Sequence, residues 1–424
     1  MALKQIKLYQ LFLPNCGRRT ISIGCCKSGG SKQKRYKMFR QRTDAVEIAK
    51  EYFDLNYVKH IKEQWPSVRC AMQSRKKYCA ILNNFTDTDA YENELVNSGA
   101  YNFIAKLHRN ATQHIQEIES KVTEITDKLS NMNDADDSML SEVDTLTEKL
   151  SEHQKLQKVC YGVRAYLYEK GDITEFDNPH KVKKLSVLPS FLLDAGSVLP
   201  ILSLDPQPGD HILDMCSAPG GKLNIIMQAI GDSGRIVAND VDSKRLTRIK
   251  NVYKEYIPKQ FSVEEFIKFV QFDGREWTEI ETNAYDKVLV DVPCTNDRHS
   301  LYTSDRDADN IFSNLRKRER AQLPHVQCEL LKNAILACRP NGIVVYSTCT
   351  ASPLQNQFVV QYAVQELLEQ HNITCQVEDT RSLVGLLHDE FQFLTSTNLG
   401  ELVIPKLDAN FGPMYFCKLR RLPD

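Results

Sequence analysis

The spacing of apolar positions along the chain changes near residue 160. Beyond that point, short apolar runs alternate with helical stretches, as in parallel strands that are buried on both faces. This alternation predicts an α/β fold with a mostly parallel, doubly wound sheet. The last two expected strands follow one another without a long helix, which predicts a C-terminal antiparallel hairpin at the sheet edge. The expected strands are 211–216, 235–240, 268–273, 286–291, 342–348, 373–377, 400–405 and 414–419.

Before residue 160 the pattern is helical. We expect a helical N-terminal region at 43–112, with residues from about 44 to 110 in helices, and a more polar segment at 113–158. In that segment, apolar residues such as Ile115 and Ile118 recur at helical spacing, stop at a polar break over 131–137, and then resume. The segment is acidic and is either a helical hairpin or a flexible insertion. This composition favours a solvent-exposed structural role, and the alternative is a helix that binds a partner.

The first 42 residues form a basic leader. No Asp or Glu precedes Asp44, whereas Lys, Arg, Ser and Thr are frequent and a short apolar patch lies within 8–13. This composition is typical of a mitochondrial transit peptide, and it predicts localisation in the mitochondrial matrix. The alternative is a disordered basic arm that binds RNA.

Composition limits the class of protein. The 424 residues carry a net charge of −1, so the chain is not a polycation built for generic nucleic-acid binding. Any nucleic acid must meet a local basic run, such as 181–184 or 316–320, or be delivered by a partner. No apolar run approaches the roughly 18 residues of a membrane helix, so we expect no membrane contact.

The 13 cysteines include no Cys-x-x-Cys pair, and the histidines show no ligand spacing around them, so we expect no metal. In a chain of this length, most of the thiols are expected to be small buried hydrophobic groups in a reducing compartment. The cysteines assigned to this group are Cys160, Cys328, Cys338, Cys375 and Cys417.

A turn that contains two glycines follows the strand ending near Asp214 and leads into a helix. Gly220 and Gly221 allow a ligand to approach the backbone at a helix N-terminus. The dinucleotide fingerprint Gly-x-Gly-x-x-Gly is absent from this turn. The P-loop pattern Gly-x-x-x-x-Gly-Lys-Ser/Thr also fails, because Leu223 follows Lys222 and Cys216 occupies the position of the first glycine. The turn therefore predicts a cofactor site without a dedicated phosphate cradle.

Acidic residues recur at the ends of the next expected strands. Asp240 is placed to accept hydrogen bonds from ribose hydroxyls, and Asp273, with the backbone of Gly274, from an adenine amino group. Arg245, five residues after Asp240, is expected against the cofactor's carboxylate or adenosine edge, the alternative being a surface arginine. These features predict S-adenosylmethionine, an adenosyl cofactor without phosphates. Its expected contacts are Cys216, Ala218, Pro219, Gly220, Gly221, Lys222, Asp240, Arg245, Asp273, Gly274 and Asp291.

Cys294 and Cys349 follow the expected strands 286–291 and 342–348. An open α/β sheet places its chemistry at the carboxyl ends of its strands, so the two thiols are expected in one crevice. Two thiols there suggest covalent catalysis by one cysteine with assistance from the other. For either cysteine alone, a buried core thiol would be the simpler interpretation.

Taken in order, five motifs resemble those of the SUN-type RNA cytosine-5 methyltransferases, which have a Rossmann-like fold. They lie at 216–222 (Cys-Ser-Ala-Pro-Gly-Gly-Lys), 239–240, 273–274, 291–295 (Asp-Val-Pro-Cys-Thr) and 347–350 (Ser-Thr-Cys-Thr). The resemblance covers about 160–424 and implies a catalytic domain at 159–424. Stretches 290–300 and 409–417 are similar to members that act on mitochondrial small-subunit ribosomal RNA. The loop after Cys294 departs from the glycine-rich, doubly basic loop of many members, and no PUA module is seen.

The resemblance implies a division of labour between the cysteines. Cys349 is the nucleophile that adds to C6 of cytosine, which makes C5 reactive towards the methyl group, and Cys294 assists release. Asp291 would hydrogen-bond the cytosine edge. Lys222 would place positive charge beside the crevice and favour a thiolate. The presence of both cysteines separates this pattern from DNA cytosine methyltransferases, which use the Pro-Cys cysteine as nucleophile.

The expected function is formation of 5-methylcytosine in mitochondrial small-subunit ribosomal RNA, with a role in mitoribosome assembly. The alternatives are a mitochondrial tRNA cytosine-5 methyltransferase and a mainly non-catalytic assembly scaffold. The expected partners are RNA and, from the resemblance alone, a helical-repeat protein of the transcription-termination-factor class.

Overall fold

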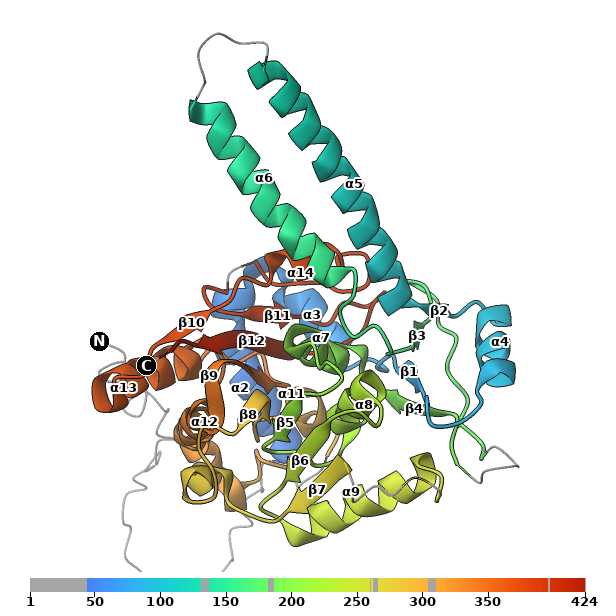
Figure 1. Cartoon of the computed structure of the whole chain (residues 1–424). Coiled ribbons are helices and arrows are strands. Elements are labelled where there is room, and N and C mark those ends of the chain that lie inside the picture. The colour runs from blue at the N-terminus through green and yellow to red at the C-terminus, as the bar shows by residue number, and fades with distance from the viewer. Residues whose placement is uncertain are drawn as a thin grey trace, which may run out of the picture. The chain divides into compact units, whose positions relative to one another are not determined.

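The computed structural model describes residues 44–130, 137–181, 187–259, 261, 266–303, 310–395 and 397–423. Ala45–Asp424 form one compact unit, and the leader at 1–42 lies outside the described residues. The described part of the chain contains an eight-stranded sheet in which β10-β12-β9-β8-β5-β6-β7 are neighbours and β11 pairs with β12 (Figure 1). Its strands are β5 (His211–Asp214), β6 (Arg235–Asn239), β7 (Ile267–Val270), β8 (Tyr285–Asp291), β9 (Cys338–Thr348), β10 (Cys375–Val377), β11 (Glu401–Val403) and β12 (Met414–Arg421).

The pairing directions confirm the predicted α/β sheet. Strands β5 to β9 pair in parallel, whereas β12 runs antiparallel to β9, β10 and β11. The antiparallel β11–β12 pair is the predicted C-terminal hairpin. All eight predicted strands are present, although several are shorter than expected; β7 ends at Val270, three residues before Asp273.

Helices cover both faces of this sheet, because side chains alternate in direction along each strand. Ile212 of β5 belongs to a core with helices α7, α8 and α9, whereas its neighbour Leu213 belongs to a core with α2, α12 and α13. The bounds of these helices are α2 (Ala45–Ile61), α7 (Leu199–Leu204), α8 (Gly221–Ile230), α9 (Ser243–Tyr256), α12 (Lys317–Ala337) and α13 (Gln357–His371). Burial on both faces explains why the strands appear as continuous apolar runs.

The N-terminal region is only partly helical, so the prediction of helices throughout 44–110 is wrong. A second, four-stranded antiparallel sheet has the order β2-β3-β1-β4, with strands β1 (Cys79–Leu82), β2 (Tyr101–Asn102), β3 (Ala165–Leu167) and β4 (Ser190–Leu193). All four residues of β1 are buried. A short apolar run of this kind cannot be distinguished from a buried helix segment by periodicity. The sheet also joins strands from both sides of the expected limit at 158.

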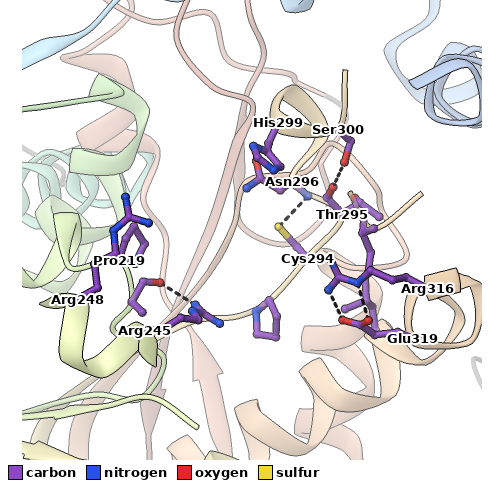
Figure 2. A pocket seen from close by; sticks show the side chains of 14 residues that line it. Pro219, Arg245, Arg248, Cys294, Thr295, Asn296, His299, Ser300, Arg316 and Glu319 are labelled. Carbon is purple, nitrogen blue, oxygen red and sulfur yellow. Dashed lines mark hydrogen bonds and ion pairs between the residues drawn. The ribbon is translucent and has the colours of Figure 1, made fainter. Parts of the chain in front are cut away.

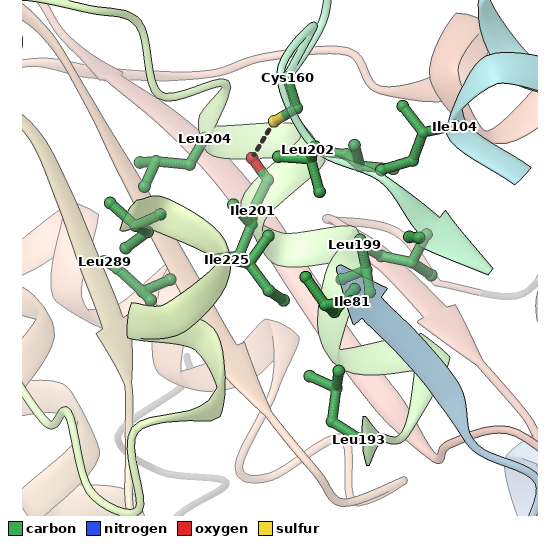
Figure 3. Packing of buried hydrophobic residues seen from close by; sticks show 14 of the residues in the cluster. Ile81, Ile104, Cys160, Leu193, Leu199, Ile201, Leu202, Leu204, Ile225 and Leu289 are labelled. Atoms are coloured by element: carbon green, nitrogen blue, oxygen red, sulfur yellow. Dashed lines mark hydrogen bonds between the residues drawn. The ribbon is translucent and has the colours of Figure 1, made fainter. Parts of the chain in front are cut away.

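The two sheets share a hydrophobic core. Figure 3 shows Ile81 of β1 and Leu193 of β4 in the same cluster as Leu199 of α7 and Ile225 of α8. Cys160 lies in this cluster too, with its thiol 3.6 Å from the carbonyl oxygen of Ile201. Cys160, Cys328, Cys338 and Cys417 are buried as predicted, and Cys375 is partly buried.

Segment 113–158 belongs to a helical hairpin, which decides between the two predicted alternatives. Helix α5 (Phe103–Ser130) begins before the expected segment and packs against α6 (Asp137–Leu156) (Figure 1). Only the half nearer the sheets is buried, through residues such as Leu107 and Ile118 of α5 and His153 of α6. The polar break at 131–136 lies outside the described residues.

The remaining elements are short, apart from two helices of the N-terminal region. They are η1 (Lys62–Gln64), α3 (Trp65–Met72), α4 (Asp89–Asn97), η2 (Ala195–Val198), η3 (Gly274–Glu279), α11 (Asp297–Ser300), η4 (Asn314–Arg316) and α14 (Arg381–Gly385). Among the helices that the structure describes, none combines the length and the apolar character that a bilayer crossing requires.

The burial pattern of the hairpin predicts where the chain tolerates shortening. Replacing 120–148 by a short linker should change the free energy of unfolding by no more than about 1 kcal/mol, because none of the described residues in this range is buried. Leu107→Ala, which opens a cavity near the sheets, should cost about 2–5 kcal/mol. Urea denaturation of both variants measures their free energies of unfolding. Equal losses of this free energy in the two variants would contradict the prediction.

Candidate active site

The glycine turn lies between β5 and α8. Gly220 has a φ of +100°, a left-handed conformation that side-chain-bearing residues rarely adopt, and α8 begins at Gly221. The turn lines a cavity of about 480 Å³ at the carboxyl ends of β5, β6 and β8, which we call the cofactor cavity. Eight of the eleven residues predicted to contact the cofactor line it: Cys216, Ala218, Pro219, Asp240, Arg245, Asp273, Gly274 and Asp291.

Asp240, directly after β6, is 3% exposed and ties the turn to the second strand. Its carboxylate accepts a hydrogen bond from the backbone N–H of Ala218 at 3.3 Å and pairs with Arg245 at 3.3 Å. Arg245 also donates to the carbonyl of Ala218 at 2.9 Å. The predicted acid and arginine therefore support the turn as well as line the cavity.

Asp273 lies in the loop after β7 and caps η3. It accepts from the backbone N–H of Arg275 and pairs with the Arg275 guanidinium, and hydrogen bonding to that side chain holds the pKa of the Asp273 carboxyl below its usual range. At Gly274 an added Cβ would come within 2.8 Å of Leu330 and 2.9 Å of Met215. Glycine at this position is thus required by packing behind the cavity.

Asn239 received no role from the sequence, although it stands in one of the motifs. Its amide donates to the carbonyls of Met215 and Phe272, both at 3.0 Å, and its carbonyl oxygen accepts from the N–H of Phe272 at 3.0 Å. The side chain therefore joins the loops after β5, β6 and β7. The position of Asn239 at the end of an apolar strand could have identified it from the sequence as a residue of the site.

The two cysteines meet where β8 and β9 end. Their Sγ atoms are 3.2 Å apart, and both residues line the cofactor cavity. The backbone N–H of Asn296 donates to the Cys294 sulfur at 3.4 Å (Figure 2). Two thiols separated by 55 positions in the chain therefore share one crevice, as the strand pattern predicted.

An ion pair lies beside the thiols. Lys222 Nζ is 2.8 Å from Asp291 Oδ2, and the Ser347 hydroxyl donates to Asp291 Oδ1 at 2.7 Å. Burial opposes the positive charge of Lys222, but the Asp291 carboxylate outweighs this effect and raises the pKa of Lys222. The lysine is therefore cationic.

The charge of Lys222 does not make Cys349 a thiolate in this structure. The hydrogen bond with Cys294 and burial raise the pKa of the Cys349 thiol well above its usual range, and the opposing effect of Lys222 is smaller. The predicted influence of Lys222 has the right direction, but it is outweighed. Cys349 therefore rests as a thiol in this structure.

Asp214 is 1% exposed, and neither of its carboxylate oxygens has a hydrogen-bond partner among the described residues. Burial, followed by the charge of Asp291, raises its pKa to about 8. A buried carboxylate without donors is unusual. A cationic or hydrogen-bond-donating ligand group would satisfy its two oxygens. The sequence placed Asp214 at a strand end without assigning it a contact.

A second cavity, of about 830 Å³, adjoins the first, and we call it the substrate cavity. Lys222, Asp291 and Cys349 line its floor, together with Gly221 and Asp214. Its other walls come from distant parts of the chain: Gln73, Arg75, Lys76, Tyr78, Phe191, Leu192, Leu193, Asp194, Arg298, His299, Tyr302, Gly412, Pro413 and Met414.

The loop after α3 is held over the substrate cavity by two buried side chains that the sequence did not single out. Arg298 donates to the carbonyl of Gly412 at 3.0 Å and to the side-chain oxygen of Asn410 at 2.6 Å. Asn410 in turn donates to the carbonyls of Ala71 and Arg75, both at 2.9 Å. The run Arg75–Tyr78 is basic and ends in an aromatic residue, and this pattern could have identified it from the sequence as a cavity-lining segment.

The basic runs proposed for RNA contact are placed differently. Arg316 pairs with Glu319 at the edge of a third cavity, of about 430 Å³ (Figure 2). Arg320 packs over the Phe312 ring at 4.7 Å, and burial lowers its pKa. Of the run 181–184, Lys181 is 3.9 Å from Glu255, and 182–184 lie outside the described residues.

Comparison with known proteins places this site in a family. Residues 201–406 match the family model "16S rRNA methyltransferase RsmB/F". The chain is 39% identical over 379 residues to the 5-cytosine rRNA methyltransferase NSUN4 of Mus musculus, covering 89% of this chain and 90% of that protein. It is 33% identical to the nsun-4 protein of Caenorhabditis elegans, with 88% and 91% covered. A mitochondrial tRNA (cytosine(34)-C(5))-methyltransferase of Danio rerio is 40% identical, but only 55% of this chain and 60% of that protein are covered.

Among solved structures, a methyltransferase homolog from Pyrococcus horikoshii has a TM-score of 0.51 at 17% identity. The match covers 89% of this chain and 99% of that one, and it supports the fold.

The carboxyl of Asp214 predicts a pH effect on stability. Its pKa is about 8 in the folded protein and about 4 in an unfolded chain, so the folded state binds the proton more tightly. The resulting stabilisation is fully present below about pH 4 and is lost as the pH rises to about 8. Relative to Asp214→Asn, the wild-type free energy of unfolding should therefore fall by up to about 1.4 kcal/mol per pH unit in this window.

Urea denaturation of both proteins without cofactor, at about pH 5, 6.5 and 8, measures this difference. A difference that stays constant with pH would contradict the assignment.

Proposed function

The chain belongs to the SUN family of S-adenosylmethionine-dependent RNA cytosine-5 methyltransferases, and we propose that it forms 5-methylcytosine in mitochondrial small-subunit ribosomal RNA. The observation that carries the proposal is the pair of thiols 3.2 Å apart in the cofactor cavity, where Cys349 also lines the substrate cavity. The ribosomal substrate is supported by relatives named as rRNA methyltransferases that match along about 90% of their length. The named tRNA methyltransferase matches over a smaller part of the chain.

The described residues fit S-adenosylmethionine. Asp240 stands at the end of β6 in the cofactor cavity, where it can accept from ribose hydroxyls. Asp273 and Gly274 lie in the same cavity for the adenine edge. Asp214, in the adjoining substrate cavity, offers two unpartnered carboxylate oxygens to a donor or cation. When bound, the cofactor supplies an electrophilic methyl group on a sulfonium centre.

Cys349 is proposed as the nucleophile. Its sulfur adds to C6 of cytosine after losing a proton, and the new C6–S bond makes C5 nucleophilic. After methylation a proton leaves C5 and the C6–S bond breaks, which restores the aromatic base and frees Cys349. Cys294, in contact with Cys349, assists this release. Neither thiol is consumed over the cycle.

Asp291 and Lys222 are proposed to bind the polar edge of the cytosine. Both line the substrate cavity next to Cys349, and their ion pair keeps a carboxylate and an ammonium at fixed positions 2.8 Å apart. Positive charge there also favours loss of the Cys349 proton when the base is bound. The base must leave its stack to reach this floor, and the 830 Å³ volume of the cavity accommodates it.

We further propose a mitochondrial matrix location, with 1–42 as transit peptide, 43–112 and 113–158 as N-terminal segments and 159–424 as the catalytic domain. The name of the Danio rerio relative includes "mitochondrial", and the basic, acid-free leader supports the same location. A helical-repeat protein of the transcription-termination-factor class and a role in mitoribosome assembly remain proposals from the family resemblance. Bisulfite sequencing of mitochondrial ribosomal RNA with and without the protein tests the substrate.

Substitution of the two cysteines separates their roles. Cys349→Ala should lower methyl transfer by roughly 10³-fold or more and form no covalent RNA adduct, because the nucleophile is absent. Cys294→Ala should accumulate an adduct that survives a denaturing gel, because release is impaired. Cys70→Ala, which removes an exposed thiol, is the control and should behave as wild type. An adduct in Cys349→Ala would contradict the assignment.

Asp240 should matter for cofactor binding through its charge. Asp240→Asn keeps the shape of the side chain and should weaken binding of S-adenosylmethionine about tenfold, equivalent to about 1.4 kcal/mol. Asp242→Asn is the matched control, because Asp242 caps α9 and does not line the cofactor cavity. Isothermal titration calorimetry measures both, and equal affinities would reject the role of Asp240.

A further inference from the structure

We propose that Tyr57, on α2 in the N-terminal region, and Asp297 are positioning residues that set the separation of the Cys294 and Cys349 thiols. The inference rests on the proposed two-thiol function of this site. It gives α2 a positioning role at the site, although α2 lies more than 200 positions before either cysteine.

Asp297 is fully buried and satisfied by donors from three segments of the chain. Its carboxylate accepts from the Tyr57 hydroxyl at 2.8 Å, from the Thr295 hydroxyl at 2.7 Å and from the backbone N–H of Ala351 at 2.8 Å. A buried carboxylate costs free energy unless such donors are present. Loss of one donor is therefore expected to change the arrangement of the others.

The network joins the residues that directly follow the two cysteines. Thr295 follows Cys294 and Thr350 follows Cys349, and their hydroxyl oxygens are 2.8 Å apart. The Tyr57 hydroxyl is also 3.0 Å from that of Thr350. Because consecutive Cα atoms are only about 3.8 Å apart, fixing these two threonines closely restricts where the neighbouring thiols can lie.

A second contact ties the loops together at the level of the backbone. The N–H of Asp297 donates to the carbonyl of Cys349 at 3.3 Å. The side-chain carbonyl oxygen of Gln355 accepts a hydrogen bond from the backbone N–H of Thr295 at 3.1 Å, and its amide donates to the hydroxyl of Thr295 at 3.1 Å. The cysteine loops are thus bonded to each other through both backbone and side-chain contacts.

Tyr57 is held firmly in place. Its ring is fully buried, stacks on Phe53 at 5.0 Å between centroids and meets the edge of Trp65 at 5.6 Å. His60, one helical turn later, is 2.8 Å from the carbonyl of Ala351 in the same loop. The hydroxyl of Tyr57 is therefore presented by a rigid helix rather than by a mobile loop.

None of the three cavities described above is lined by Tyr57, Asp297 or Thr350. These side chains therefore do not meet the base or the cofactor, and any effect on the reaction passes through the cysteine loops. The ion pair of Lys222 and Asp291 lies outside this network and can remain intact when the network is altered.

The test compares Tyr57→Phe with Tyr285→Phe. Each change removes one hydroxyl that donates to a carboxylate from a buried tyrosine, because Tyr285 donates to Glu281 at 2.6 Å at the far end of β8. Tyr57→Phe should lower kcat about tenfold while KM for RNA and for S-adenosylmethionine stays within about twofold. Tyr285→Phe should leave all three constants unchanged.

A second readout measures thiol spacing without RNA or cofactor. In a glutathione buffer, the Cys294 and Cys349 thiols form a disulfide while glutathione disulfide is reduced to two thiols, and mass spectrometry gives the equilibrium constant. Tyr57→Phe and Thr350→Val should lower this constant about tenfold. Thr350→Ser, which keeps the hydroxyl, should restore it, and Tyr285→Phe should not change it.

Unchanged kcat and an unchanged thiol equilibrium in Tyr57→Phe would overturn the proposal. So would losses that merely follow thermal stability in Tyr57→Phe and Tyr285→Phe alike. If the wild-type protein does not methylate RNA, the proposed function fails, but the thiol equilibrium still decides whether the network sets the spacing.

Discussion

The parallel pairing of β8 with β9 is the constraint on which the rest of the site depends. Asp291 lies opposite Ser347 in this register, and the serine hydroxyl donates to the aspartate at 2.7 Å. Neighbouring strands are about 4.8 Å apart, so the loops that leave them carry Cys294 and Cys349 into contact. A shift of one residue would turn Asp291 to the opposite face and away from Lys222. The network around Asp297 then fixes the loops beyond the strands.

Burial of charge is the second physical theme of the site. Asp214, Asp240 and Asp291 gather near the glycine turn, while Lys222, whose side chain is 12% exposed, pairs with Asp291. Burial and repulsion by Asp291 raise the pKa of Asp214 to about 8, and the hydrogen bond with Cys294, together with burial, keeps the Cys349 thiol protonated. Asp214 and Cys349 therefore rest in their neutral forms beside the Lys222–Asp291 ion pair, and ligands that bring donors or positive charge would change this balance.

The N-terminal region is structurally inseparable from the methyltransferase sheet. It shares a hydrophobic core through Ile81 and supplies one wall of the substrate cavity through Arg75 and Tyr78. It also provides the Tyr57 hydroxyl next to the cysteine loops. The substrate cavity is thus shaped in part by residues of the N-terminal region.

The sequence by itself determined the approximate positions of the strands of the main sheet, their mostly parallel arrangement, the glycine turn and the two strand-end cysteines. These features depend on local patterns: buried strands need continuous apolar runs, and a left-handed turn position needs Gly220. It did not distinguish β1 from a helix, and it did not indicate Arg298, Asn410, Tyr57 or Asp297. Only the tertiary structure decided those contacts, because Tyr57 and Asp297 are 240 positions apart and no local pattern specifies which distant side chains will meet once the core has packed.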